Sequence, residues 1–235
     1  MPLFLKYRRQ DLVELMDMED CDIQQLNNTY LHFRTINRLL SQWKVIYKKE
    51  IRPVLQKLGG SATLLDIGFG GGDVPIHLLE MAKKDGFSLH ITAIETDERA
   101  LEFINTIDTP KEINFQHCAS SDLVHQGARF DLVISNHLVH HLDGETFNAV
   151  LSDARSMATY KVLFNDIERS DLGYALYAVF SRLLFRNSFV VYDGSLSIRR
   201  SFTLAELKEQ KPSNWKVRRI FPFRLLLTYS PNGNG

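Results

Sequence analysis

The sequence has few cysteines and no excess of charge of either sign. Cys21 and Cys118 are the only cysteines among 235 residues, and their wide separation predicts neither a disulfide framework nor a metal-binding thiolate pair. The 28 Lys and Arg residues are matched by 28 Asp and Glu residues. This balance argues against a protein that finds nucleic acid or an anionic membrane through bulk charge, although it is compatible with a local basic patch.

Long apolar runs are also missing. No run reaches the ~18 apolar residues that a helix needs to cross a bilayer, and residues 1–9 contain no apolar segment of signal-peptide length. We therefore predict a soluble cytoplasmic protein with reduced thiols and no membrane insertion. Hydrophobic residues still make up 44% of the chain, so its 235 residues can form one sizeable α/β domain with a substantial core.

The chain does contain a glycine-rich turn between an apolar run and an amphipathic segment. Residues 64–67 are Leu-Leu-Asp-Ile, and four glycines follow within positions 68–72. Because glycine has no Cβ, a nucleotide-like ligand can come close to the backbone N–H groups that begin the next helix. The dinucleotide fingerprint G-x-G-x-x-G would need glycine at position 73, which is Asp73, so a nicotinamide cofactor is not favoured.

Short apolar runs alternate with amphipathic segments from residue 62 onward, which is typical of a parallel sheet between helix layers. Two last strands, separated by Pro222 and Phe223, predict an antiparallel hairpin. We expect residues 231–235 to be disordered. The predicted strands are 62–67, 90–95, 113–117, 130–135, 161–166, 215–221 and 224–229, and the predicted helices are 73–84, 97–106, 144–158 and 203–211, the last with a capping box from Thr203 to Glu206.

Two segments fall outside this alternation. Residues 23–58 carry apolar side chains three or four positions apart, which predicts helices with a break near Ser41 or at Pro53. We expect residues 1–60 to form a helical cap over the ligand edge, the alternative being helices that only pack on the sheet. Residues 172–189 are predicted to be helical and 190–200 irregular, so 168–202 is expected to be a lid insertion within a main domain of residues 61–235.

Glu95 follows a predicted strand at the spacing where an acid accepts hydrogen bonds from ribose hydroxyls. Together with residues 64–74, 120–122 and 130–133, it resembles in order and spacing the class I S-adenosylmethionine-dependent methyltransferases of the small-molecule type. The resemblance covers residues 62–166 and implies an α/β, Rossmann-like fold with a seven-stranded sheet whose last strand is antiparallel. It also implies S-adenosylmethionine as the cofactor and S-adenosylhomocysteine as the product.

The resemblance also assigns cofactor-binding roles. Asp66 and Gly68 are expected near the methionine moiety, two further glycines in the turn, Glu95 at the ribose and Asp122 near the adenine amine. Ser121 is the alternative to Asp122, because the gap to the next strand is short for the family. The full set of expected cofactor-binding residues is Asp66, Gly68, Gly70, Gly72, Glu95, Thr96, Asp122 and Asn136.

Residues 135–142, Ser-Asn-His-Leu-Val-His-His-Leu, follow a predicted strand, and ligands of open α/β sheets bind beyond such strand ends. An acceptor oxygen attacks a sulfonium methyl better as an anion, so His140 or His141, with an ordinary imidazole pKa of about 6.5, is a candidate general base. The alternative is a histidine pair that only packs and hydrogen-bonds. Neighbouring histidines on a helix point apart, and no carboxylate lies at ligand spacing to complete a metal-binding set with His137, His140 and His141. No metal is therefore predicted.

The segment 168–202 resembles, more loosely, methyltransferases that accompany bacterial type III polyketide synthases, which implies a phenolic or related aromatic acceptor. Tyr30, Tyr174, Tyr177, Tyr192 and Arg199 are the expected acceptor contacts, although buried helix faces and solvated charges are the alternatives. Nucleic acid is not expected, because residues 136–139 lack the Asn/Asp-Pro-Pro-aromatic segment of nucleobase methyltransferases. We predict O-methylation of a small, mostly apolar or aromatic hydroxyl compound; the alternatives are C-methylation of a quinone-like ring and a non-catalytic cofactor-binding module.

Overall fold

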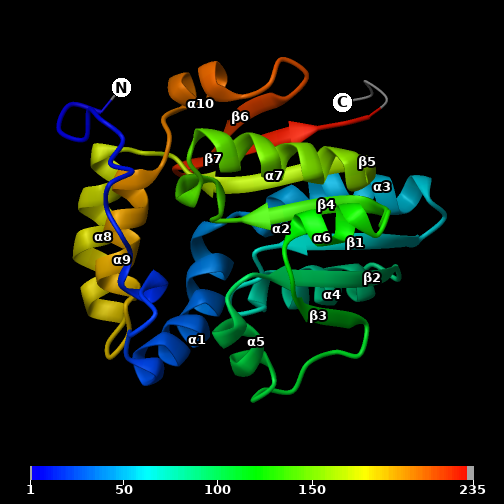
Figure 1. The fold of residues 1–235 in the computed structure, drawn as a ribbon, viewed down its shortest axis with the longest axis horizontal. Coiled ribbons are helices and arrows are strands. Elements are labelled where there is room, and N and C mark those ends of the chain that lie inside the picture. Colours follow the sequence, from blue (N-terminus) through cyan, green and yellow to red (C-terminus); the bar gives the residue numbers. More distant parts are fainter. Residues whose placement is uncertain (1, 232–235) are drawn as a thin grey trace.

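The computed structural model describes residues 2–231, and its centre is a seven-stranded sheet of order β3-β2-β1-β4-β5-β7-β6 (Figure 1). β1 to β5 are parallel, while β7 runs antiparallel to β5 and to β6. The predicted Rossmann-like fold is therefore confirmed. The strands are β1 (Ser61–Ile67), β2 (Ser88–Glu95), β3 (Ile113–His117), β4 (Phe130–Asn136), β5 (Ala158–Ile167), β6 (Lys216–Ile220) and β7 (Arg224–Tyr229).

Helices cover both faces of the sheet, and others stand beyond the carboxyl ends of its strands (Figure 1). The short elements include a π-helix, η2 (Tyr47–Ile51), and two 3₁₀ turns, η1 (Leu15–Asp17) and η3 (Val139–His141). The α-helices are α1 (Ile23–Leu40), α2 (Trp43–Ile46), α3 (Arg52–Lys57), α4 (Asp73–Lys84), α5 (Glu98–Ile104), α6 (Ser120–His125), α7 (Gly144–Met157), α8 (Asp171–Leu184), α9 (Val190–Arg200) and α10 (Leu204–Gln210).

The core lies in two layers because the central strands are apolar on both faces. Leu64 points into the layer formed with α1 to α5, and Leu65 into the layer formed with α6, α7 and α10. Neighbouring strands alternate in the same way, as buried parallel strands do. The glycine turn and the ends of four parallel strands are thereby held at one edge of a rigid sheet.

The helical pattern before β1 breaks at one of the two predicted places. α1 ends at Leu40 and Gln42 takes a φ of 61°, so the chain changes direction there. At Pro53 the helical path continues, because the preceding π-helical turn leads directly into α3 and a proline in the first turn of a helix removes no needed N–H donor. The break near Ser41 is confirmed.

The prediction that 190–200 is irregular is wrong, since this segment is the helix α9. Its buried residues alternate between apolar ones, Val190, Leu196 and Ile198, and polar ones, Asp193, Ser197 and Arg200, so the inward face of α9 is mixed and the usual apolar stripe is interrupted. α6 was also not predicted from the pattern. The predicted capping box of α10 is confirmed, with Glu206 N–H donating to Thr203 Oγ1 at 3.3 Å.

The N-terminal segment, α8 and α9 stand beyond the carboxyl ends of the strands (Figure 1). Backbone N–H groups of the N-terminal segment donate to two acids of these helices: those of Phe4 and Leu5 to Asp171, and those of Leu15 and Met16 to Asp193. Residues 232–235, which include most of the segment expected to be disordered, lie outside the described range. Within residues 2–231, no helix is both long and apolar enough to cross a bilayer.

Candidate active site

A cavity of about 1300 Å³ opens beyond the carboxyl ends of β1, β2, β4 and β5. One end is formed by the turn between β1 and α4, and the walls come from α1, α8, α9 and the segment around η1. The strand order reverses between β1 and β4, and ligands of open α/β sheets bind at such a switch point. This cavity is the candidate active site.

The glycine turn forms one end of the cavity. Gly68 and Gly70 line it with φ angles of 81° and 52°, a backbone region that residues with a side chain rarely adopt. Gly71, for which no role was predicted, lies against α1: a Cβ there would be 2.8 Å from the carbonyl oxygen of Tyr30. Gly72 does not line the cavity, because it immediately precedes α4 and packs beneath side chains of α5 and β3.

Glu95 lies at the end of β2, on the cavity wall beside the turn. Its carboxylate accepts hydrogen bonds from the backbone N–H of Gly70 at 3.1 Å and from that of Thr96 at 2.8 Å. The acid therefore fixes the turn against β2 and presents a charged group to the cavity. This position is compatible with the ribose contact predicted for Glu95.

Asp66 is a buried acid at the same end of the cavity as the glycine turn. It is 1% exposed, lines the cavity, and has one carboxylate oxygen without a hydrogen-bond partner. Burial, together with the charges of Asp73 and Glu95, raises the pKa of Asp66 well above its ordinary value. Burial likewise raises the pKa of Asp73 to about 6. A cationic ligand group beside these acids would compensate their desolvation, and the ammonium and sulfonium of S-adenosylmethionine meet that requirement.

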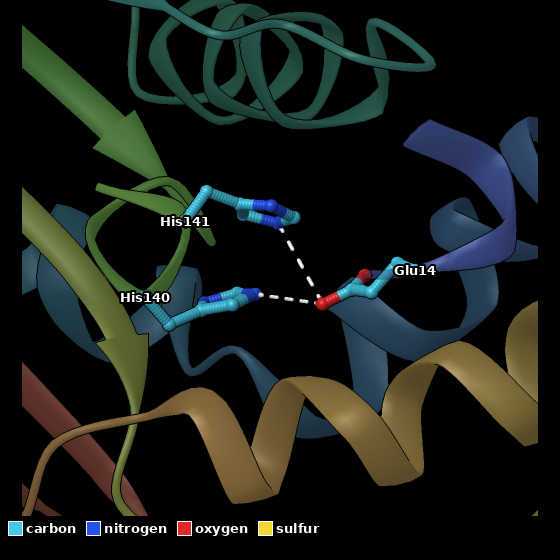
Figure 2. Close-up of side chains that lie close together, drawn as sticks. All are labelled: Glu14, His140 and His141. Atoms are coloured by element: carbon cyan, nitrogen blue, oxygen red, sulfur yellow. Dashed lines mark ion pairs between the residues drawn. The ribbon is translucent and has the colours of Figure 1, made fainter. Parts of the chain in front are cut away.

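The other end of the cavity contains a cluster of the buried Glu14 and His140 with the half-buried His141 (Figure 2). Nε2 of His140 lies 3.5 Å from Glu14 Oε1, and Nε2 of His141 lies 3.9 Å from the same oxygen. The two imidazole rings are 4.2 Å apart at 38°, because they belong to a tight 3₁₀ turn and not to an α-helix. The premise that the rings point apart is therefore wrong.

Each histidine of the cluster has a second carboxylate behind it. Asp166, at the end of β5, contacts His140 Nδ1 at 2.7 Å and accepts the backbone N–H of His140 at 2.7 Å. Asp17 lies 3.3 Å from His141 Nδ1. Although burial opposes protonation, Asp166 and Glu14 raise the pKa of His140 to about 9. His140 is therefore an imidazolium at neutral pH, whereas the side chain of His141, 26% exposed, faces the cavity.

The N-terminal segment places Glu14 in this cluster. The carboxylate of Asp193 in α9 accepts the backbone N–H groups of Leu15 and Met16 at 2.8 and 3.0 Å, which fixes the chain just after Glu14. Ser197 Oγ donates to Glu14 Oε1 at 2.9 Å. Burial alone would raise the pKa of Glu14, but the neighbouring histidines hold it below the ordinary value. Sequence reasoning missed Glu14, since no local pattern joins it to residues 140–141.

Glu14, His140 and His141 could also hold a divalent cation, because one ligand atom of each lies within 4.8 Å of the others. The prediction that no carboxylate completes such a set is therefore wrong. However, Nη1 of Arg200 lies 3.6 Å from Glu14 Oε1, so a cation of the chain already balances this carboxylate. The third predicted candidate, His137, is separate: it is bonded to Arg224, and burial together with that charge lowers its pKa well below the ordinary value.

The cavity brings together ten of the predicted site residues. Tyr30 lies beside the glycine turn, while the Tyr177 hydroxyl donates to the carbonyl of Val190 at 2.6 Å and joins α8 to α9. Asn136 accepts the indole N–H of Trp43 at 2.9 Å, which holds α2 to the sheet. The ten are Asp66, Gly68, Gly70, Glu95, Thr96, Asn136, His140, His141, Tyr30 and Tyr177.

Five predicted site residues do not line the cavity: Gly72, Asp122, Tyr174, Tyr192 and Arg199. Asp122 accepts the backbone N–H of Ala119 at 2.9 Å and caps α6. Tyr192 is 54% exposed on α9. Arg200, one position after the predicted Arg199, reaches Glu14 instead, because neighbouring residues of a helix point in directions about 100° apart.

Replacing Glu95 with alanine is expected to weaken binding of S-adenosylhomocysteine by about 1–3 kcal/mol, because charge-assisted hydrogen bonds to the ligand and to the turn are lost. Titration calorimetry measures this change. Glu102→Ala, which removes an exposed acid of α5, is the matched control and should keep the wild-type affinity. An unchanged affinity of Glu95→Ala would remove this residue from the binding site.

Residues 64–159 match a protein-family model described as a methyltransferase domain. A search of curated proteins found no match. Among solved structures, the plantazolicin methyltransferase BpumL, in complex with a triazolic desmethylPZN analog and SAH, is similar over 91% of this chain and 95% of its own, with 12% identity and a TM-score of 0.58. An O-methyltransferase family protein from Burkholderia thailandensis is similar over 93% and 67%, with 17% identity and a TM-score of 0.54.

Residues 64–159 therefore match a methyltransferase domain, and the seven-stranded sheet has the fold that the resemblance to class I methyltransferases predicts. The predicted class is confirmed. The roles of the individual site residues and the association with polyketide synthases stay predictions.

Proposed function

We propose that this protein transfers the methyl group of S-adenosylmethionine to an oxygen of a small, mostly apolar or aromatic acceptor. One observation carries the proposal: a single cavity joins the buried acid Asp66 at the glycine turn to the polar cluster of Glu14 and His141. Between these ends its wall is largely apolar, with side chains such as Phe33 and Leu176. Such a cavity suits a cationic methyl donor at one end and an apolar acceptor with one polar group at the other.

The cofactor end would hold S-adenosylmethionine through two acids and the glycine turn. Asp66 would receive its ammonium group, Glu95 its ribose hydroxyls, and the glycine turn would lie along its chain. When bound, the cofactor supplies a methyl group on a sulfonium. The protein's part is to hold the acceptor oxygen in line with that methyl group and to exclude water, and positioning of this kind provides much of the acceleration.

His141 is the proposed general base, and His140 is a positioning residue. Both ring nitrogens of His140 face carboxylates and its pKa of about 9 keeps it charged, so it cannot accept a further proton at neutral pH. A neutral His141 with its Nδ1 proton toward Asp17 has its lone pair on Nε2, in the cavity. The acceptor O–H proton would pass to this nitrogen as the oxygen takes the methyl group, and Glu14 would stabilise the resulting imidazolium.

Residues 1–60 and 168–202 are proposed to act as the cap and the lid of the enzyme. Both contribute walls to the cavity, through α1 and the Glu14 segment in the first case and through α8 and α9 in the second. They would determine which acceptors fit, while residues 61–167 provide the cofactor site. This division assigns acceptor recognition to the parts of the chain outside the family match.

The experiment that tests the proposal is incubation of the full chain with methyl-labelled S-adenosylmethionine and a panel of lipophilic phenols, aromatic carboxylates and quinols. Label on an acceptor oxygen, located by mass spectrometry and NMR, is the expected result. Label on a ring carbon would establish C-methylation instead. S-adenosylhomocysteine binding without transfer to any compound of the panel would contradict the proposal and favour a non-catalytic module.

A further inference from the structure

The lid helix α8 has an apolar face that is exposed to solvent. Leu172, Leu176, Val179, Phe180, Leu183 and Leu184 are 42–71% exposed and recur every three or four positions along the helix. Soluble proteins rarely leave such a continuous apolar stripe uncovered, and an uncovered stripe marks an interaction site. In Figure 1, α8 lies at the outer edge of the molecule, on the far side of α9 from the sheet.

This exposed face is continuous with the mouth of the active-site cavity. Leu172, Leu176, Phe180 and Leu184 are exposed and line the cavity as well. Two other elements add exposed apolar side chains to the cavity lining: Leu39, 60% exposed at the end of α1, and Phe221, 87% exposed between β6 and β7. An apolar rim around an open cavity allows an apolar molecule to enter without crossing water.

The charges around this face are positive. Arg182 in α8 and Arg186 just after it are exposed, and neither has an ion-pair partner among residues 2–231. The single acid of α8, Asp171, is occupied by backbone N–H groups of the N-terminal segment. A helix with an apolar stripe and unpaired arginines has the properties of helices that lie in a membrane interface, where the arginines contact anionic headgroups.

We propose that α8 docks the protein on an anionic lipid surface, with the cavity mouth facing the lipid. A lipid surface is favoured over a second protein molecule because a tightly packed protein would close the mouth through which an acceptor must enter. That last step rests on the proposed methyl transfer. The docking is peripheral: the 14-residue helix lies along the surface and does not span it.

The test is sedimentation of the full chain with phosphatidylcholine vesicles, with and without phosphatidylglycerol, and with no cofactor present. The wild type is expected to bind the mixed vesicles and to be released by salt. Leu183→Glu and Val179→Glu, which change exposed residues outside the cavity lining, should each lower the partition about tenfold or more. Arg182→Glu with Arg186→Glu should weaken binding to the mixed vesicles alone.

Leu31→Glu is the matched control, because Leu31 is an exposed leucine of α1, 55% exposed, that does not line this cavity. It should bind vesicles as the wild type does. Thermal unfolding checks that the variants fold. Because no cofactor is present in the assay, the vesicle result does not depend on cofactor binding or on methyl transfer. Absence of wild-type binding to the mixed vesicles, or binding that the α8 variants do not change, would overturn the proposal. So would a wild-type dimer in sedimentation velocity that Leu183→Glu converts to a monomer.

Discussion

His141→Ala is expected to lower kcat by about 10²–10⁴-fold, the usual contribution of general acid–base catalysis, while leaving cofactor affinity unchanged. The reason is geometric. Nε2 of His141 faces the cavity 3.9 Å from Glu14 Oε1, whereas its other nitrogen lies 3.3 Å from Asp17. Removal of the ring takes away the imidazole nitrogen that is proposed to receive the acceptor proton. Steady-state transfer of labelled methyl to the acceptor measures the change.

Two controls make this prediction specific. His125→Ala changes an exposed histidine of α6, distant from the cavity lining, and should keep the wild-type rate. An added small base such as imidazole should restore part of the activity of His141→Ala, because the space left by the missing ring opens onto the active-site cavity. Full turnover of His141→Ala would show that positioning alone drives the transfer, and the base assignment would then be abandoned.

His140→Ala is expected to destabilise the fold by about 3–5 kcal/mol, because it removes the buried cation that Asp166 and Glu14 share and leaves Glu14 with Arg200 as its partner. Both acids are nearly inaccessible to water, with 4% and 2% exposure. Urea unfolding followed by circular dichroism measures the loss, and His125→Ala again serves as the control. A change below the scatter of surface substitutions would show that the Asp166–His140–Glu14 contacts contribute little to stability.

The same contacts predict how stability depends on pH. Since the pKa of His140 is raised to about 9 in the folded protein, its protonated ring contributes fully below the unfolded value of about 6.5. The contribution, on the order of 3 kcal/mol, is then lost as the pH rises from about 6.5 through about 9. The free energy of unfolding should fall over this interval in the wild type, and His140→Ala should flatten the slope. An equal slope in both proteins would contradict the assignment.

The features that could be predicted from the sequence are those whose residues lie close together along the chain. The turn at 68–72, the acid at the end of β2 and the alternation of strands and helices are local patterns, and each has a direct structural consequence. The antiparallel hairpin at the C-terminus was predictable for the same reason. These features belong to the sheet and its carboxyl edge, which the domain needs whatever its acceptor.

The acceptor end could not be predicted in the same way, because distant segments build it. Glu14 meets His140 only after the N-terminal segment crosses α9, and the backbone N–H groups that donate to the Asp193 carboxylate and hold it there have no sequence signature. Arg200 was missed by one position, because the buried face of α9 mixes polar and apolar residues and the sequence pattern does not show which arginine points inward. The close rings of His140 and His141 follow from a 3₁₀ turn that periodicity does not reveal.

S-adenosylmethionine is expected to bind in this cavity with its cationic groups beside the buried acid at the end of β1. Titration calorimetry of the full chain with S-adenosylhomocysteine, which retains the ammonium group, tests it most directly. We expect saturable binding to the wild type and a loss of about tenfold or more in affinity for Asp66→Asn, because a charge-assisted contact is removed. No heat of binding at millimolar ligand, or equal affinity of the two proteins, would contradict it.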